Sequence, residues 1–476
     1  MRDRKKSPHG VKSLIRATEG FLEVIIMTAL YYFVFRQGYD GALFPDFLGN
    51  GKYVLSGVYL LLLTMLFFGM DGFKFGYLRN MDVLVSQWIA LVGTNFITFW
   101  QLCLIANRVI SPVPILMMTL VGAVVALICT VGYASLYHKL YVPKNMAMIL
   151  GRDDAVTLKF KMETRPDKYH VVKLIPVEDG FESICRQIVE YDAVIINDVP
   201  AQIRNDILKF CYEHSIRTYL TPKITDIVVR GAQSIALFDT PLLLVKGNGL
   251  TPANAFWKRV MDLVLCLIVM VVAAPVMLVV ALAIKLEDGG PVFYKQARVT
   301  LNGKVFDILK FRSMIVDAEK EGHSIPATGK DPRITKVGRF IRACRVDELP
   351  QLLNIIKGDM SIVGPRPERV EHMESYGKDV PEFILRTKVK GGLTGYAQVY
   401  GKYNTSPYDK LRLDMMYIEN YSLALDIKLI LMTLRILLKK ESTEGFEMVE
   451  QQQKMAEEVL KDVHKEHAQE PAGAEK

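Results

Sequence analysis

The feature of this sequence that most restricts its fold is a set of long apolar runs near the N-terminus. Four such runs lie at about residues 15–35, 53–70, 83–106 and 113–137. A helix needs about 20 mostly apolar residues to cross a bilayer, and each run approaches or exceeds that length. The second run has no polar face, which argues against a helix in a soluble bundle. We therefore expect residues 1–142 to form a four-helix transmembrane region.

Basic residues in the short loops indicate how these spans are oriented. The N-terminal tail is rich in lysine and arginine, the second loop contains Lys74 and Arg79, and Lys139 and Lys144 follow the fourth span. Cytoplasmic loops carry an excess of basic residues, so both ends of the region should face the cytoplasm. The sequence thus predicts a multi-pass protein of the inner (cytoplasmic) membrane, with everything after about residue 143 on the cytoplasmic side.

A different pattern begins after the fourth span, where short apolar runs alternate with helical stretches. Strands are expected at residues 147–150, 171–175, 193–196 and 218–220, and helices near 182–190 and 201–213. This alternation is typical of a parallel sheet, so we predict a Rossmann-like α/β domain over residues 143–240. The first strand leads into Gly151-Arg152-Asp153-Asp154, which lacks the glycine fingerprint for a dinucleotide. A structural or regulatory domain without a bound nucleotide is the favoured interpretation.

A fifth apolar run, over about residues 258–285, differs from the first four. Lys258 and Arg259 precede its apolar part, and Pro275 lies in the middle, where it removes a backbone hydrogen bond and kinks the helix. A complete crossing would place the basic sequence that follows outside the cell, against the positive-inside tendency. These features favour a re-entrant helix that enters and leaves the bilayer at its cytoplasmic face. An ordinary proline-kinked span is the alternative.

Basic residues at high density follow this run. Arg298, Lys310 and Arg312 lie among apolar residues in segments expected to form strands or short helices. Such a cationic face suits a diphosphate or anionic lipid headgroups. The formal net charge of +8 also favours anionic partners, and the large apolar content favours membrane and phosphate ligands over nucleic acid. A solvated basic face is the alternative for any one of these residues.

Two adjacent carboxylates, Asp347 and Glu348, stand before a short apolar helix pattern. Asp347 is expected to cap that helix, with Pro350 in the first turn and Gly358 at the end. The free N–H groups of a helix N-terminus bind phosphate, and Arg342 lies nearby to bind the same anion. The alternative is a simple capping aspartate beside a solvated glutamate.

A second candidate element is the loop Gly364-Pro365-Arg366-Pro367-Glu368. The two prolines restrict the backbone around Arg366, which suits bidentate binding of a phosphate. A structural turn with an exposed cation is the alternative. A glycine-rich turn at residues 391–398 is expected to approach a ligand closely.

Together these motifs resemble the bacterial sugar transferase family, the polyprenyl-phosphate glycosylphosphotransferases. The resemblance covers about residues 256–438 and rests on Asp-Glu-Leu-Pro-Gln at 347–351 followed by Gly-Pro-Arg-Pro-Glu at 364–368. It implies a mainly α (α+β) catalytic domain over residues 253–443 that includes the re-entrant helix. The N-terminal half is similar in layout to the large membrane members. The polar residues 444–476 are expected to be disordered.

The resemblance implies transfer of a sugar-1-phosphate from a UDP-sugar to undecaprenyl phosphate, with release of UMP, as the first membrane step of exopolysaccharide or capsule synthesis. Asp347 would be the nucleophile in a ping-pong scheme. Glu348 would complete the dyad and, with Asp347, hold Mg²⁺, while Arg342 and Arg366 would bind phosphate. A homodimer is also implied. An inactive membrane scaffold or regulator of polysaccharide assembly is the alternative, and the identity of the sugar stays open.

Overall fold

The computed structural model comprises two compact units, Met1–Val142 and Pro143–Lys476. The described residues are 9–39, 50–140, 143–151, 155–237, 239–247, 249–316, 318, 331–401 and 405–437. The polar tail predicted over residues 444–476 lies outside these ranges.

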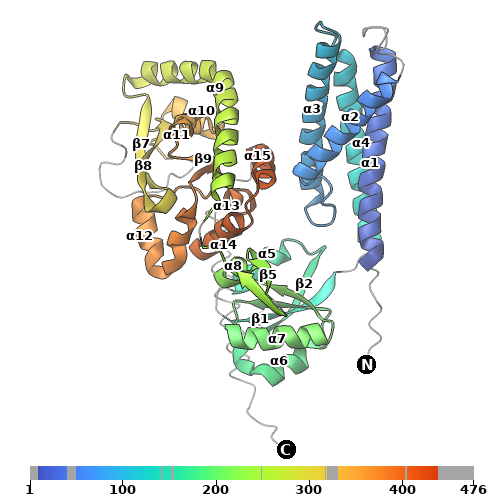
Figure 1. Ribbon diagram of the computed structural model, residues 1–476, viewed down its shortest axis with the longest axis vertical. Helices are drawn as coiled ribbons and strands as arrows, with labels where there is room; N and C mark the ends of the chain where they lie inside the picture. The colour runs from blue at the N-terminus through green and yellow to red at the C-terminus, as the bar shows by residue number, and fades with distance from the viewer. Residues whose placement is uncertain are drawn as a thin grey trace, which may run out of the picture. The chain divides into compact units, whose positions relative to one another are not determined.

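The first unit is a set of four long helices packed side by side (Figure 1). They are α1 (His9–Gly38), α2 (Gly51–Gly69), α3 (Asn80–Ile105) and α4 (Val113–Leu140). Each contains a segment long and apolar enough to cross a membrane, which confirms the four predicted helices.

A buried polar cluster links three of these helices. Gln87 of α3 donates from Nε2 to Oε2 of the buried Glu23 on α1 at 2.8 Å, and accepts at Oε1 from the Thr130 hydroxyl of α4 at 3.1 Å. Buried polar groups need such partners, because no water is available to replace them. The cluster therefore ties the first helix, which has acidic residues near its start, into the bundle.

The second unit begins with a four-stranded parallel sheet in the order β2-β1-β3-β4. Its strands are β1 (Lys144–Leu150), β2 (Tyr169–Pro176), β3 (Ala193–Asn197) and β4 (Arg217–Leu220), at the predicted positions. Helices α6 (Phe181–Ile188) and α7 (Ala201–Glu213) bury apolar residues against one face. Helix α5 (Ala155–Glu163) covers the other face. This sheet and its helices, together with α8 (Ile224–Arg230), are called the middle domain below.

A single long helix, α9 (Pro252–Asp288), follows the antiparallel hairpin of β5 (Gln233–Leu237) and β6 (Thr240–Leu244). Figure 1 shows that α9 bends sharply into two arms. Pro275 lies inside the helix, and a proline in that position is a recognised cause of a kink. Most of the apolar surface of α9 is not covered by the rest of the chain.

The remaining part is mainly helical with short strands. Its elements are β7 (Phe293–Val299), β8 (Val305–Phe311), α10 (Lys336–Ala343), α11 (Gln351–Lys357), β9 (Ser361–Val363), α12 (Val370–Asp379), β10 (Gly392–Thr394), α13 (Tyr396–Tyr400), α14 (Pro407–Glu419) and α15 (Leu423–Leu437), with short 3₁₀ turns between them. Strands β7 and β8 form an antiparallel hairpin, and β9 pairs with β10 in parallel.

The two basic residues at the start of α9 anchor it to this part. Lys258 forms an ion pair of 2.6 Å with the fully buried Asp426 of α15, and the Tyr417 hydroxyl donates to the same carboxylate at 2.8 Å. Arg259 donates to the carbonyl oxygens of Ile355 and Ile356, at 2.6 and 2.7 Å. These carbonyls belong to the last turn of α11, where a cation is favourable.

We expect Lys258→Met to lower the free energy of unfolding by about 3 to 5 kcal/mol, because it leaves Asp426 buried without its cation. The double variant Lys258→Met/Asp426→Asn should recover much of this loss, since it leaves no unpaired charge. Unfolding of the detergent-solubilised protein in denaturant measures both effects. Lys357→Met is the matched control, because the Lys357 side chain is 75% exposed in its ion pair with Asp359. Equal stability of Lys258→Met and the wild type would contradict the prediction.

Candidate active site

Strand β8 and helix α11 bring the predicted basic and acidic residues together. Phe306 and Ile308 alternate along β8 on its buried face, and Lys310 continues this row. The Asn354 side chain of α11 bonds the β8 backbone twice, accepting from Leu309 N at 2.9 Å and donating to Asp307 O at 2.8 Å. These contacts fix α11 beside the strand, and Lys310 Nζ then donates to Oε1 of Glu348 at 3.0 Å.

The dyad lies on a 3₁₀ turn, Val346–Glu348, and not at the N-cap of a helix. Helix α11 begins only at Gln351, with Pro350 before it and no side-chain cap. The prediction that Asp347 caps the helix is therefore wrong. The physical reason for the difference is that Arg345 has a left-handed backbone (φ 54°), which turns the chain so that the 3₁₀ turn precedes the helix. The predicted end is confirmed, because Gly358 ends α11 at φ 97°.

Glu348 is held by two cations. Arg366 Nη2 donates to Oε1 of Glu348 at 3.0 Å, the same oxygen that Lys310 contacts. Burial by itself raises the pKa of the Glu348 carboxyl, but the charges and hydrogen bonds of Arg366 and Lys310 outweigh it and hold the pKa well below its usual range. Glu348 is therefore ionised at neutral pH. The Arg366 side chain is 42% exposed, so its guanidinium is accessible to a ligand as well.

Asp347 is shifted in the opposite direction. Burial raises the pKa of its carboxyl above the usual value, and the positive charges of Lys310 and Arg342 oppose this effect. Two neighbouring carboxyl groups whose pKa values are moved apart are a recurrent arrangement in active sites, where each group has a different task. The structure thus places Lys310, Arg342 and Arg366 around the Asp347–Glu348 dyad.

The loop that carries Arg366 is fixed through its backbone. Gly364 N donates to Thr394 O at 2.8 Å, and Gly392 N donates to Pro365 O at 2.9 Å. A Cβ at Gly364 would overlap the Lys390 carbonyl oxygen, so only glycine fits there. The glycine-rich turn at residues 391–398 therefore supports this loop through close backbone contacts.

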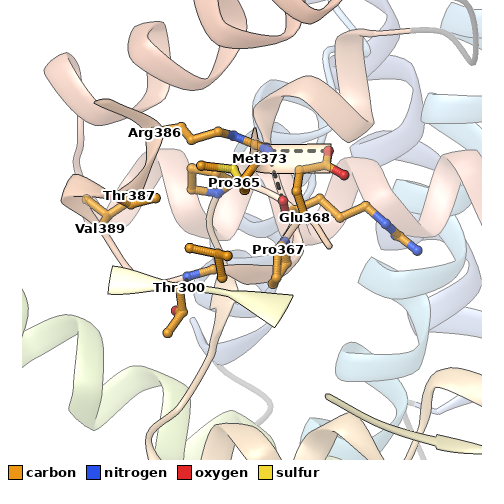
Figure 2. Close-up of a pocket in the computed structure, with 11 residues that line it drawn as sticks. Thr300, Pro365, Pro367, Glu368, Met373, Arg386, Thr387 and Val389 are labelled. Carbon is orange, nitrogen blue, oxygen red and sulfur yellow. Dashed lines mark hydrogen bonds and ion pairs between the residues drawn. The ribbon is translucent and has the colours of Figure 1, made fainter. Parts of the chain in front are cut away.

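A buried ion network supports the same loop from Glu368. Arg386 Nη1 lies 3.3 Å from Oε1 of Glu368 (Figure 2). Lys410 Nζ lies 2.8 Å from the same oxygen. Arg386 also pairs with the buried Asp414 at 2.7 Å and donates to the Arg366 carbonyl oxygen at 3.0 Å. Burial raises the pKa of Glu368, but the charges of Arg386 and Lys410 lower it to about 2. The hollow beside this network lies against the loop, and the dyad is not among its lining residues (Figure 2).

The other predicted residues lie around this centre in different roles. Arg298 supports the loop, because its Nη1 donates to the Pro367 carbonyl oxygen at 3.0 Å. Burial lowers the pKa of Arg298 to about 10. Arg312 instead forms an ion pair with Asp288 at the end of α9. Sequence reasoning missed Arg386 and Lys410, because single basic residues in helical segments carry no pattern that distinguishes them from solvated ones.

The two dyad carboxylates are the candidate metal ligands. No group of three or more potential ligands from His, Cys, Asp and Glu occurs within the described ranges. Mg²⁺ commonly binds through one or two carboxylates together with phosphate oxygens and water. The pair Asp347 and Glu348 therefore fits Mg²⁺ that arrives with a phosphorylated ligand, and does not fit a site built from the protein alone.

Comparisons with known proteins converge on one family. The family sequence model described as bacterial sugar transferase matches residues 253–440. A UDP-glucose:undecaprenyl-phosphate glucose-1-phosphate transferase of Klebsiella pneumoniae is 36% identical over 247 residues, which are 51% of each chain. A protein of the same name from Caulobacter vibrioides is 40% identical over 212 residues, 43% of this chain and 79% of that protein.

A relative with a different donor also matches. The UDP-N-acetylgalactosamine-undecaprenyl-phosphate N-acetylgalactosaminephosphotransferase of Aeromonas hydrophila is 36% identical over 262 residues, 52% of this chain and 60% of that protein. The matched region spans about half of the length of the Klebsiella relative and of several others.

We expect the contribution of Glu368 to stability to depend on pH. Folding lowers its pKa from 4.5 to about 2, so the carboxylate stabilises the fold above pH 4.5, and this stabilisation is lost as the pH falls through the folded pKa. At pH 7 the free energy of unfolding of the wild type should exceed that of Glu368→Gln by on the order of 3 kcal/mol. This difference should shrink below pH 4.5. Unfolding curves at several pH values measure it, with the exposed Glu371→Gln as control. A difference that is constant with pH would contradict the assignment.

Proposed function

Because the chain belongs to the bacterial sugar transferase family, we propose that it transfers a sugar-1-phosphate from a UDP-sugar to undecaprenyl phosphate and releases UMP. The observation that carries this proposal is the dyad of Asp347 and Glu348 with Arg366 and Lys310 on the same carboxylate. The names of the relatives support the donor and acceptor classes. The relatives use different sugars, so the sugar of this chain is left open.

In the proposed reaction, Asp347 is the nucleophile. Its carboxylate oxygen attacks the β-phosphorus of the UDP-sugar, the bond from this phosphorus to the bridging oxygen breaks, and UMP leaves with that oxygen. A phosphate oxygen of undecaprenyl phosphate then attacks the same phosphorus and displaces Asp347. A carboxylate whose pKa is raised by burial is a more basic nucleophile than an exposed one.

Arg366 and Lys310 supply positive charge where negative charge accumulates on the phosphates. Their two charges balance those of the ionised dyad, and Glu348 keeps both cations in place. Arg342 adds a third cation near Asp347. Mg²⁺, held by Asp347 and Glu348, would neutralise phosphate charge when the donor is bound.

The attachment of α9 supports a re-entrant helix. The first end of α9 bonds α11 and α15 through Arg259 and Lys258, and at the other end Asp288 bonds Arg312 beside β8. A straight crossing would place the two ends about 30 Å apart on opposite sides of the bilayer. Since one cytoplasmic domain would hold both ends, α9 would enter and leave by the same face.

The second arm of α9 also supports a site at the membrane surface. Val280 and Ile284 pack in one cluster with Val346 and Leu349, which flank the dyad. The outer face of the helix is apolar and exposed, as at Leu278, and would face lipid acyl chains. In this arrangement the phosphate of undecaprenyl phosphate reaches Asp347 without leaving the headgroup region.

The cellular role follows from the proposed reaction. A lipid-linked sugar of this kind begins the assembly of an exopolysaccharide or capsule on the cytoplasmic face. The division into a transmembrane region, a Rossmann-like domain and a catalytic domain at residues 253–443 is part of the same proposal, with the bilayer and both substrates as partners. The homodimer stays a prediction.

We expect Asp347→Asn to abolish UMP release from UDP-sugars, with a loss of at least about 1,000-fold, because the covalent step has no substitute nucleophile. The assay uses the full-length protein in lipid nanodiscs with Mg²⁺, undecaprenyl phosphate and a panel of UDP-glucose, UDP-galactose and UDP-N-acetylgalactosamine. Asp206→Asn, on an exposed ion pair of the middle domain, is the control. Wild-type activity in Asp347→Asn would exclude Asp347 as the nucleophile. A folded wild type that is inactive with the whole panel would favour the scaffold alternative.

The pH profile of kcat/KM should report the ionisation of Asp347. The ionised carboxylate is the nucleophile, so the rate rises as the pH rises through its pKa, which burial places above the usual value. The charge of Lys310 lowers this pKa, so Lys310→Met should move the acidic limb to higher pH in addition to lowering the rate. The exposed Lys304→Met is the control. An acidic limb at the same pH in Lys310→Met would show that the limb belongs to another group.

A further inference from the structure

Helix α8 of the middle domain contacts the part of the chain that carries the dyad. An ion pair ties α8 to the rest of the middle domain. Arg204 of α7 donates from Nη1 and Nη2 to the two oxygens of Asp226 on α8, at 2.6 and 3.0 Å. Asp226 also accepts from Lys223 N at 2.8 Å, in the first turn of α8. A bidentate arginine–carboxylate pair fixes both side chains in one geometry, so α8 moves with the middle domain.

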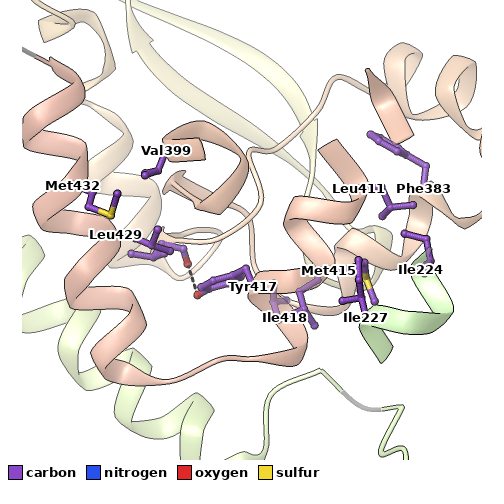
Figure 3. Close-up of a cluster of buried hydrophobic side chains, with 12 residues drawn as sticks. Ile224, Ile227, Phe383, Val399, Leu411, Met415, Tyr417, Ile418, Leu429 and Met432 are labelled. Carbon is purple, nitrogen blue, oxygen red and sulfur yellow. Dashed lines mark hydrogen bonds between the residues drawn. The ribbon is translucent and has the colours of Figure 1, made fainter. Parts of the chain in front are cut away.

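The partner of α8 is α14. Ile224 and Ile227 of α8 are buried in the same hydrophobic cluster as Leu411 and Met415 of α14 (Figure 3). Leu411 and Met415 are four residues apart and lie on one face of α14. The two domains therefore share one apolar core here, in place of the polar surfaces that freely moving domains present to each other.

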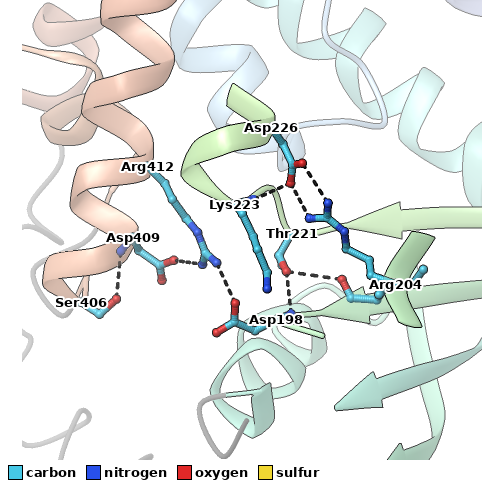
Figure 4. Close-up of polar contacts among 9 residues, drawn as sticks. Asp198, Arg204, Thr221, Lys223, Asp226, Ser406, Asp409 and Arg412 are labelled. Atoms are coloured by element: carbon cyan, nitrogen blue, oxygen red, sulfur yellow. Dashed lines mark hydrogen bonds and ion pairs between the residues drawn. The ribbon is translucent and has the colours of Figure 1, made fainter. Parts of the chain in front are cut away.

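A charged contact lies beside this core. Arg412 of α14 donates from Nη2 to Oδ1 of Asp198 at 3.3 Å and from Nη1 to Oδ1 of Asp409 at 2.9 Å (Figure 4). The Arg412 guanidinium also lies 4.2 Å from the centroid of the Tyr408 ring. The side chains of Arg412 and Asp198 are 13% and 16% exposed, so this ion pair is shielded from most solvent.

The position of Asp198 in the sheet is informative. Strand β2 lies on one side of β1, and the chain then crosses to β3 on the other side of β1. The carboxyl ends of β1 and β3 therefore form a topological switch point. Open α/β sheets bind their ligands at such a point. Asp198 is the first residue after β3, in a left-handed conformation (φ 54°), and Gly151 after β1 packs against its carbonyl oxygen. At this edge, Asp198 binds the arginine of α14.

The face of α14 that bears Lys410 and Asp414 contacts the active-site loop. These residues are four apart, and they bond Glu368 and Arg386, respectively. Arg386 donates in turn to the carbonyl oxygen of Arg366, the residue that contacts Glu348 of the dyad. Helix α14 therefore lies between the switch point of the middle domain and the loop that presents Arg366.

We propose that the middle domain positions the active-site loop through α14, with the ion pair of Asp198 and Arg412 as the contact that sets the position of the helix. Asp198 and Arg412 are positioning residues that touch neither dyad nor substrate. The consequence for catalysis rests on the proposed transferase function, whereas the consequence for the mobility of the loop does not.

The test is a double-mutant cycle with Asp198→Asn, Arg412→Gln and the double variant, in full-length protein in nanodiscs. Asparagine keeps the size of the side chain and tolerates the left-handed backbone. Hydrogen–deuterium exchange of peptides over residues 362–370 and 405–419 reports the loop and α14, and UMP release gives kcat and KM. Asp206→Asn is the control, since its ion pair with Lys209 lies on an exposed face of the same domain.

Each single variant should exchange faster than the wild type in both segments and should lower kcat by about fivefold. The double variant should be no worse than Arg412→Gln alone, because that substitution already removes the interaction with Asp198. Unchanged exchange over residues 362–370 in both single variants would overturn the proposal, and so would additive losses in the double variant. If the wild type itself releases no UMP, the proposed function fails, and the exchange data alone then decide this inference.

Discussion

The ion pairs among the buried charged residues around Glu368 are the interaction on which the geometry of the candidate active site depends. Glu368, Arg386 and Asp414 are all nearly excluded from solvent, and each of them would be costly to bury alone. Their mutual ion pairs, with the partly exposed Lys410, offset this desolvation cost and hold the side chains in one geometry. The loop of Arg366 has little choice of conformation as a result, and a preorganised cation is more effective against phosphate than one that must first be ordered.

Much of the fold could be predicted from the sequence, because the relevant signals are local. The apolar runs have the length of a membrane span, and α1 to α4 appear where those runs lie. The period of the strands and the positions of α6 and α7 were likewise readable from residue patterns. Pro275 indicated the bend of α9, but the orientation of its two arms depends on packing against residues far away in the chain.

The candidate site was predictable in its residues and less so in its geometry. The cluster of Lys310, Glu348 and Arg366 joins segments up to 56 positions apart, and only the order of the motifs, not any periodicity, indicated that they meet. Asp347 was expected at a helix cap, but the left-handed Arg345 inserts a 3₁₀ turn, and residue type alone does not reveal that conformation. Arg386 could not be singled out, since burial decides its role and burial is a property of the folded chain.

The packing of α9 under the dyad has a geometric consequence. With α9 in the bilayer as proposed, the depth of Asp347 is set by the contact of Val280 and Ile284 with Val346 and Leu349, which belongs to the protein alone. The reacting plane would then keep the same height above the acyl chains whatever the thickness of the membrane. A helix that spans the bilayer must tilt or kink, or the bilayer must change its local thickness, whereas a re-entrant helix requires none of these adjustments. Asp347 would therefore meet the phosphate of the lipid substrate at the same depth in bilayers of different composition.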